Sequence, residues 1–268
     1  MTIHSKIKIS TDWGFLMLGI CRSPRFYRPY DKIPLNLIVM IEHLPTWIEV
    51  LFLITWIITI GFFYQANGKP KLLTSVIILW SILHSILAYI GFYQVTTTIP
   101  PRFALVLGPA ILLIIYGLLP KQRAWIHTHR DIRWSTYLHS VRIPVEMVLL
   151  YLFLNKMIPE LMTFEGRNFD ILAGLTAPII GFLYGRGMLS KRILISWNVI
   201  ALLLVSFIMI NGILSVEFPF QQFGFEQPNR GINYFPFVLL PAVIVPIVIY
   251  THISDIIKLR KELAEASN

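Results

Sequence analysis

Seven long apolar segments, separated by short polar connections, dominate the pattern of this chain. A helix needs about 20 predominantly apolar residues to cross the hydrocarbon layer of a membrane. These segments are far longer than the alternating stretches of about 10 residues that build outer-membrane barrels. The predicted spans are residues 44–64, 72–93, 102–119, 134–156, 171–186, 193–215 and 233–257. The sequence therefore predicts an all-α fold, a polytopic transmembrane bundle of seven helices.

The fifth predicted span is short and holds Gly174, Pro178 and Gly181. Proline kinks helices, and glycine lets neighbouring helices approach closely. We therefore expect this helix to be kinked or buried within the bundle.

Composition agrees with a membrane protein. Of the 268 residues, 56% are hydrophobic and only 14% are charged, with a mean hydropathy of +0.67, whereas soluble domains carry about 25% charged residues. The formal net charge is +9. Because the basic residues flank apolar segments, we expect lipid headgroups as their partner and not nucleic acid. The single cysteine, Cys21, excludes an intrachain disulfide and a cysteine-based metal cluster.

Lysine and arginine in the connections predict the orientation, because cytoplasmic loops are enriched in both. Alternate connections and the C-terminal tail hold twelve basic residues on one side, and the other connections hold four. The twelve are Lys69, Lys71, Lys121, Arg123, Arg130, Arg133, Arg186, Lys191, Arg192, Lys258, Arg260 and Lys261; the four are Arg102, Lys156, Arg167 and Arg230. The predicted topology is an outside N-terminus and a cytoplasmic C-terminus.

Residues 1–42 depart from this charge pattern, because they hold six basic residues yet would lie outside. Their apolar piece is too short to span and lacks the cleavage pattern of a signal peptide. Either they form a basic arm at the outer surface, or Met40 is the natural start and an extension precedes it. The second alternative is favoured because the membrane pattern begins just after Met40. The predicted organisation is an arm at 1–42, a seven-helix domain at 43–258 and a short cytoplasmic tail at 259–268.

The fourth span carries the densest set of ionisable residues, namely His139, Arg142 and Glu146. Ionisable groups inside a membrane are costly, so each is a candidate for function. Spacings of three and four place all three on one helix face. Arg142 and Glu146 are expected to form an ion pair that lowers the cost of burying both. Such a pair would serve equally well as a structural clamp between helices.

Other polar residues fall at comparable depth: His84 in the second span, Asn198 in the sixth and His252 in the seventh. Together with the fourth-span set they would form one polar pocket that binds a ligand or relays protons. The alternative is that each hydrogen-bonds a neighbouring helix. His252, with Asp255 one turn beyond, could also simply reach the headgroups.

Three intramembrane histidines raise the question of haem or a metal, since imidazole is a ligand for both. His84 and His139 are the candidates, but no pair has the short spacing of a dedicated metal motif, so no metal site is assigned. The seventh span, 233–257, has no lysine for a Schiff base, which excludes a retinal protein.

Two outer loops are unusually polar and aromatic. They hold Glu165, Arg167, Asn168 and Asp170 in the first, and Gln221, Gln222, Glu226 and Asn229 among several phenylalanines in the second. Asp170 is expected to cap the fifth span, since Asp at a helix start accepts from unpaired amides. The aromatic residues fit either an interfacial belt or a folded cap over an outward-facing cavity.

The segments 139–146, 162–170 and 226–229 together resemble those of a family of bacterial multi-pass, seven-helix membrane proteins of unknown function. The resemblance covers the chain from about Met40 to the tail. It implies a location in the bacterial cytoplasmic membrane and brings no activity or ligand with it.

Three functions remain open on the sequence. The first is binding or transport of a small polar, anionic or lipid-like ligand by the intramembrane residues. The second is a membrane enzyme acting on a lipid or quinone, with His139 and Glu146 as acid and base and haem as a possible partner; no catalytic residue is assigned. The third is a sensor or accessory subunit that packs against a partner membrane protein.

Overall fold

The structure is a computed structural model, and it describes residue 41 and residues 43–267. The predictions for the N-terminal arm, including the start at Met40, fall outside the described residues. The described part contains helices and no strand, which confirms the all-α class. Its α-helices are α1 (Thr46–Ala66), α2 (Lys71–Tyr89), α3 (Ala104–Gly117), α4 (Pro120–His129), α5 (Ile132–Leu138), α6 (Arg142–Leu154), α7 (Ile171–Gly185), α8 (Lys191–Leu214) and α9 (Val245–Glu265).

Shorter helical pieces join these elements. Four are 3-10 turns: η1 (Phe92–Gln94), η2 (His139–Val141), η3 (Glu160–Met162) and η4 (Gly231–Asn233). The fifth, η5 (Leu240–Ile244), is a π-helical segment that runs directly into α9. Pro144, in the first turn of α6, lacks an N–H and cannot bond to the carbonyl of Ser140 four residues earlier, and the turn η2 that contains Ser140 is a tighter 3-10 turn.

Several helices are long and apolar enough to cross a membrane. Among the described residues these are α1, α2, the continuous stretch Ile132–Leu154, α8 and the stretch Leu240–Glu265. The pair α3 and α4, bent by 73°, would make a sixth. Helix α7 is apolar but shorter, as the sequence indicated for the fifth segment. The structure thus supports five to six spans by length and composition.

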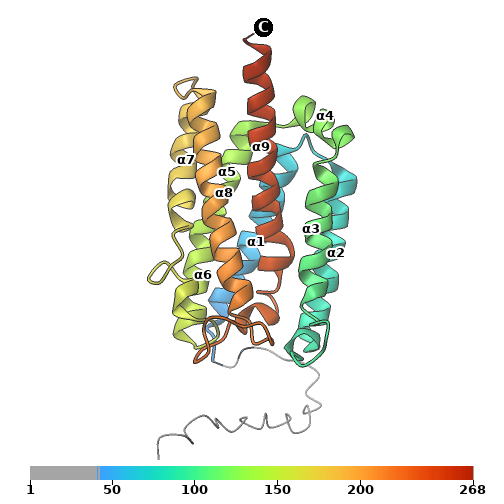
Figure 1. Ribbon diagram of the computed structural model, residues 1–268, viewed down its shortest axis with the longest axis vertical. Coiled ribbons are helices and arrows are strands. Elements are labelled where there is room, and N and C mark those ends of the chain that lie inside the picture. Colours follow the sequence, from blue (N-terminus) through green and yellow to red (C-terminus); the bar gives the residue numbers. More distant parts are fainter. Residues whose placement is uncertain (1–40, 42, 268) are drawn as a thin grey trace, which may run out of the picture. The chain divides into compact units, whose positions relative to one another are not determined.

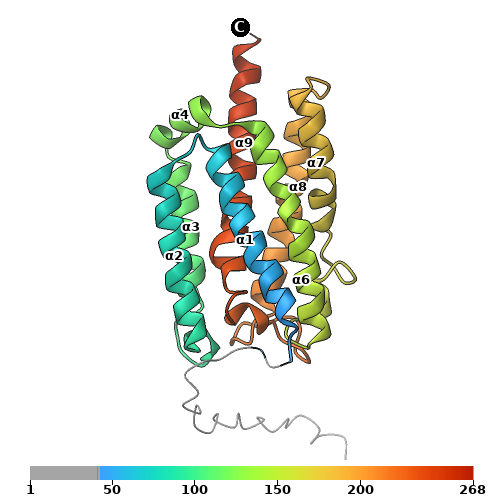
Figure 2. The ribbon, with the colours of Figure 1, turned by 180° about the vertical axis from the view of Figure 1, so that it is seen from behind.

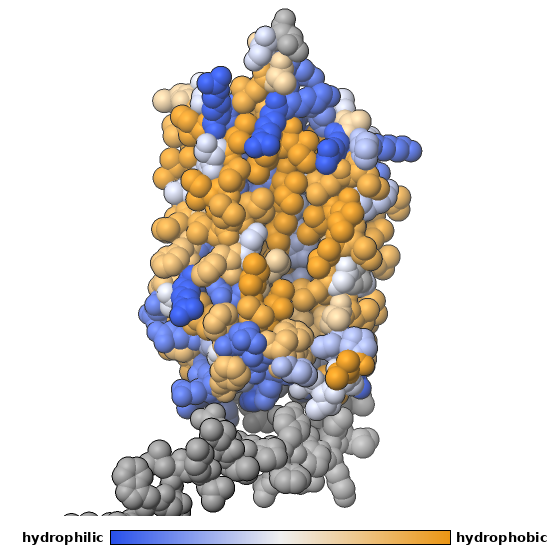
Figure 3. All heavy atoms as spheres, viewed as in Figure 1, coloured by the Kyte–Doolittle hydropathy of each residue, from blue (hydrophilic) through white to orange (hydrophobic). Residues whose placement is uncertain are grey.

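The outer surface has the character of a lipid-facing surface. In the view of Figure 3, apolar residues form a broad band between two hydrophilic ends. Large apolar side chains point outward with high exposure, for example Leu72 at 81%, Leu79 at 66% and Leu203 at 65%. Monomeric soluble proteins rarely expose apolar surface on this scale. The band is therefore the property expected of an integral membrane protein.

The helices divide into two groups around α9. Helices α7 and α8 lie on one side, while α2 and α3 form a hairpin on the other, as the two opposite views agree (Figures 1 and 2). The α1–α2 connection, α4 and the C-terminal end of α9 lie at the same end of the bundle (Figure 1).

Helix α7 meets its neighbours through a face of small residues. Its buried positions are Ala173, Gly174, Ala177 and Gly181. A Cβ added at Gly174 would lie 3.0 Å from Cβ of Arg142, on α6. Small residues let helix backbones approach closely in a membrane. The predicted burial of this short helix is therefore found on one face only, because Phe182 and Ile179 are exposed on the other.

The π-helical segment has a local cause. Pro246 has no N–H, so it cannot bond to the carbonyl of Ala242 four residues earlier. The indole Nε1 of Trp80 donates to that carbonyl at 3.3 Å. The proline therefore frees a backbone acceptor on the last span, and a side chain of α2 uses it.

Gly174, on the small face of α7, and Gly61, on α1, should respond differently when a larger side chain replaces the glycine. Gly174→Val should lower the free energy of unfolding by about 1–3 kcal/mol, because the added atoms overpack the contact with α6. Gly61→Ala is the control: its Cβ would meet nothing within 4 Å, so it should be neutral or stabilise by up to about 1 kcal/mol. Denaturant titration in lipid micelles measures both, and equal effects would contradict the close contact.

Candidate functional site

The guanidinium of Arg142 is the centre of a buried polar cluster. Arg142 is 3% exposed. Its Nη1 donates to Oδ1 of Asp170, just before α7, at 2.7 Å. Its Nη2 lies 2.8 Å from Nε2 of His252 on α9. One side chain therefore connects α6, α7 and α9.

The second nitrogen of His252 determines how this ring is protonated. Nδ1 lies 2.7 Å from Oδ1 of Asn198, whose Nδ2 donates to the carbonyl of Leu194 at 3.0 Å. Because Oδ1 can only accept, Nδ1 of His252 carries the hydrogen, and Nε2 is left to accept from Arg142. His252 is thus a neutral imidazole with both nitrogens paired.

His139 lies against this ring without a hydrogen bond of its own. The two imidazoles stack with centroids 3.7 Å apart and planes 5° from parallel, and Trp197 contacts both. His139 is fully buried, and neither of its ring nitrogens has a partner among the described residues. Such groups cost about 1–3 kcal/mol each when nothing binds them.

Glu146 completes the cluster through the first outer loop. Its Oε1 accepts from Nδ2 of Asn168, while Oε2 has no partner among the described residues. Asn168 and Glu146 are 1% and 2% exposed. The loop before α7 therefore inserts Asn168 between the helices, where it contacts Glu146 of α6.

Three expectations about these polar residues are wrong. Arg142 pairs with Asp170, not with Glu146, because the loop before α7 brings a carboxylate to the guanidinium. Asp170 in turn makes no side-chain cap for α7. His252 and Asp255 also do not reach headgroups, since both are fully buried.

His84 makes its contacts elsewhere. Its Nδ1 is hydrogen-bonded to the hydroxyl of Tyr93 at 2.5 Å, and Trp80 packs edge-on against its ring. The structure therefore brings His139, Arg142, Glu146, Asn198 and His252 into one cluster and leaves His84 outside it.

A second buried network lies closer to the end of the bundle that carries α4. Nε of Arg130 donates to Oδ1 of Asp255 at 2.5 Å, and Nη1 donates to Oδ1 of Asn67 at 2.6 Å. Ser135 donates to the other oxygen of Asp255 at 2.5 Å. The loop after α1, the segment before α5 and α9 are joined by this network. Sequence reasoning missed it because Arg130 was counted as a headgroup-facing charge.

The two loops that the sequence predicts to lie outside are toward the end of the bundle opposite α4 (Figure 1). Nδ2 of Asn229 donates to the carbonyl of Gly212 at 3.1 Å, and the amide groups of Gln221 and Gln222 bond to carbonyls within their own loop. Glu165, Arg167 and Glu226 are exposed, and Phe225 is 69% exposed. The buried Asn229 thus satisfies a carbonyl near the end of α8, while exposed aromatic residues such as Phe225 fit an interfacial belt.

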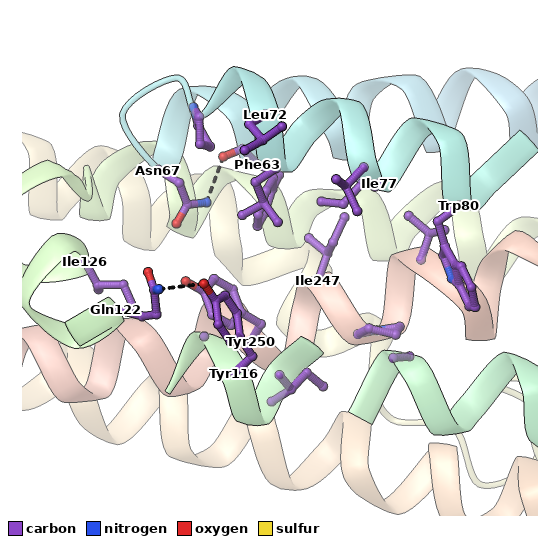
Figure 4. A pocket seen from close by; sticks show the side chains of 18 of the residues that line it. Phe63, Asn67, Leu72, Ile77, Trp80, Tyr116, Gln122, Ile126, Ile247 and Tyr250 are labelled. Carbon is purple, nitrogen blue, oxygen red and sulfur yellow. Dashed lines mark hydrogen bonds between the residues drawn. The ribbon is translucent and has the colours of Figure 1, made fainter. Parts of the chain in front are cut away.

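A pocket of about 690 Å³ lies between the α2–α3 hairpin and helices α1, α4 and α9. We call it the hairpin pocket (Figure 4). Its walls are mostly apolar, with Ile77 and Trp80 on α2 and Ile247 and Tyr250 on α9. One of its walls, at Val76, is 44% exposed, so the pocket opens at the surface of the bundle. None of the Arg142 cluster lines it.

The polar end of the hairpin pocket has its own residues. Lining residues there are Asn67, Lys69, Lys71, Tyr116 and Gln122. Nε2 of Gln122 donates to the hydroxyl of Tyr116 at 2.9 Å, and Nδ2 of Asn67 donates to the carbonyl of Phe63 at 2.8 Å, both drawn in Figure 4. Asn67 therefore belongs both to the pocket and to the Arg130 network.

Whether a metal could bind depends on which histidine nitrogens are free, and both nitrogens of His252 are already hydrogen-bonded. Within the described part of the chain, no three His, Cys, Asp or Glu side chains meet in a way that could hold a metal ion. His252 could ligate a metal only by losing its bond to Asn198 or to Arg142.

Comparison with known proteins places the chain in a family. A model described as "Domain of unknown function (DUF8737)" matches residues 98–260, more than half of the chain. The chain belongs to the DUF8737 family. The DUF8737 region contains the whole Arg142 cluster and α3 to most of α9, whereas α1, α2 and His84 precede it. No curated protein and no solved structure matches the chain.

The buried pair at Arg142 predicts a large effect on stability. Arg142→Ala should lower the free energy of unfolding by about 3–5 kcal/mol, because it leaves the Asp170 carboxylate buried without its partner. The control is Lys191→Ala, which breaks the more exposed pair with Glu262 and should cost at most about 1 kcal/mol. Denaturant titration in lipid micelles measures both, and similar losses would contradict the role given to Arg142.

The two stacked histidines predict an asymmetric result. His139→Phe keeps a flat ring against His252 and removes two unpartnered nitrogens, so stability should be unchanged or rise by about 1 kcal/mol. His252→Phe removes partners from Arg142 and Asn198 and should cost about 1–3 kcal/mol or more. Thermal unfolding of the two variants compares them directly. A loss in His139→Phe as large as that in His252→Phe would contradict the conclusion that His139 adds no hydrogen bond to the cluster.

Proposed function

We propose that this protein binds the apolar chain of a lipid-like ligand in the hairpin pocket. The observation that carries the proposal is the pocket itself, a space of about 690 Å³ with apolar walls and a polar end. Ligand sites are typically concavities of about 300–1,000 Å³, lined by apolar and aromatic side chains with a few placed polar groups. An opening on the lipid-facing surface gives a membrane-dissolved molecule direct access.

The proposal moves the binding function away from the Arg142 cluster. Arg142, Asp170, Asn198 and His252 bond to one another across four elements, which supports a clamp between helices. The hairpin pocket, in contrast, is lined by apolar side chains that have no hydrogen-bonding groups with which to clamp helices, such as Val76 and Ile114. Binding is therefore assigned to the pocket, and fixing the bundle is assigned to the cluster.

The membrane topology is part of the proposal. We propose seven crossings in a bacterial cytoplasmic membrane, with α3 and α7 added to the five long spans. The excess of basic residues on one side supports an outside N-terminus and a cytoplasmic C-terminus. In that orientation Lys69 and Lys71 lie at the cytoplasmic leaflet, and the ligand enters from that leaflet.

Photo-crosslinking tests the proposed function. The protein is placed in nanodiscs that contain phosphatidic acid or phosphatidylcholine with a diazirine on the acyl chain, and labelled peptides are mapped by mass spectrometry. We expect labels on the pocket-facing residues of α3 and of η5 with α9. Val76→Trp, which fills the pocket, should reduce this labelling about tenfold, equivalent to roughly 1.4 kcal/mol of binding.

The matched control is Leu79→Trp on the same helix. Leu79 is 66% exposed and does not line the hairpin pocket, so this variant adds the same ring outside the pocket. Labelling of the pocket peptides should be unchanged. Equal labelling in wild type and Val76→Trp, or labels only on outward faces, would overturn the proposal.

A further inference from the structure

The charged side chains at the polar end of the hairpin pocket are all positive among the described residues. Lys69 and Lys71 line it, and among the described residues no Asp or Glu does. Both lysines are exposed, and neither forms an ion pair within the described residues. Other lysines at this end of the bundle do have acidic partners. Lys191 and Lys258 contact Glu262, and Lys261 contacts Glu265. The positive charge at the pocket is therefore not neutralised by any acidic residue that the structure describes.

The turn that carries Lys69 is held in an unusual conformation. Gly68 and Lys69 have φ of +72° and +62°, and a non-glycine residue in this region is uncommon. The amide of Lys69 bonds to the carbonyl of Tyr64 at 2.9 Å. A Cβ at Gly68 would collide with the His129 side chain, so the turn is pressed onto α4. The backbone of Lys69 is thus fixed before any ligand arrives, which lowers the entropic cost of ordering this turn on binding.

A neutral donor lies at the same end of the pocket. The hydroxyl of Tyr116 accepts a hydrogen bond from Gln122 at 2.9 Å. A phenol that accepts keeps its own hydrogen for a further acceptor. The first turn of α2, which begins at Lys71, has no side-chain cap, and its amides add positive potential there. Ammonium groups, a phenol donor and free amides are together suited to an oxygen-rich anion.

From this arrangement we infer that the headgroup at the hairpin pocket is an anionic phosphate without a compensating positive charge. The inference rests on the proposed function, because the acyl chain in the pocket holds the headgroup at this end. A phosphate offers several acceptor oxygens and a net negative charge, and both match the groups present. A choline headgroup would place a fixed cation beside Lys69 and Lys71, where like charges repel.

The test compares two headgroups on the same acyl chain. Wild-type protein in nanodiscs is labelled with diazirine phosphatidic acid or diazirine phosphatidylcholine, and labelling of the pocket peptides is expressed as a ratio. Each lysine near a membrane surface favours anionic lipid by about fivefold. Lys69→Gln combined with Lys71→Gln should therefore lower the ratio by about 30-fold, while phosphatidylcholine labelling does not fall, because the repulsion of its choline group is removed as well.

Lys121→Gln is the control, because Lys121 is an exposed residue of α4 at the same end that does not line the pocket. It should leave the ratio unchanged. A ratio that is unaffected by the double variant, or that the control lowers equally, would overturn the phosphate inference. If both lipids still labelled the pocket in that case, the proposed function would stand. Absence of pocket labelling by either lipid would overturn both.

Discussion

The guanidinium of Arg142 imposes the strictest constraint on this bundle. A charge that is almost fully buried in a membrane protein needs a counter-charge and hydrogen-bond acceptors around it. Asp170 from the loop before α7 and His252 from α9 supply these groups, and Asn198 orients His252 from α8. The positions of four elements are thereby coupled. The small face of α7 fits this arrangement, because Gly174 lets α7 approach Arg142 so closely that an added Cβ would lie only 3.0 Å from Cβ of Arg142.

The two sides of the bundle are stabilised in different ways. On the side of α7 and α8, polar side chains join the helices. On the side of the α2–α3 hairpin, contacts are mostly apolar, and Trp80 provides a hydrogen bond to the carbonyl freed by Pro246. Polar clamps hold helices at fixed spacing, whereas apolar contacts are non-directional and tolerate an opening. This difference explains why the pocket lies beside the hairpin. The Arg130 network reaches the hairpin pocket, since Arg130 contacts Asn67 and Tyr250 and both line the pocket.

Part of the candidate site could be predicted from local spacing. His139, Arg142 and Glu146 were expected on one face, and all three are buried in the bundle. Their partners could not be predicted in the same way. Asp170 precedes a helix, so it resembled a cap, and Arg130 stood among basic residues, so it resembled a headgroup contact. Their actual partners lie 28 and 125 positions away, a separation at which helical periodicity carries no information.

The sequence by itself determined that this chain is helical and membrane-like. Long apolar runs leave backbone groups without water, and only helices satisfy those groups within each segment. It also determined which side chains are too polar to face lipid. The tertiary structure decided which of them meet, that His84 stands apart, and that the cavity lies beside the hairpin and not at the polar residues. A cavity depends on how side-chain volumes from α1, α2, α3, α4 and α9 fit together, and this packing is not expressed in the order of residues along any one helix.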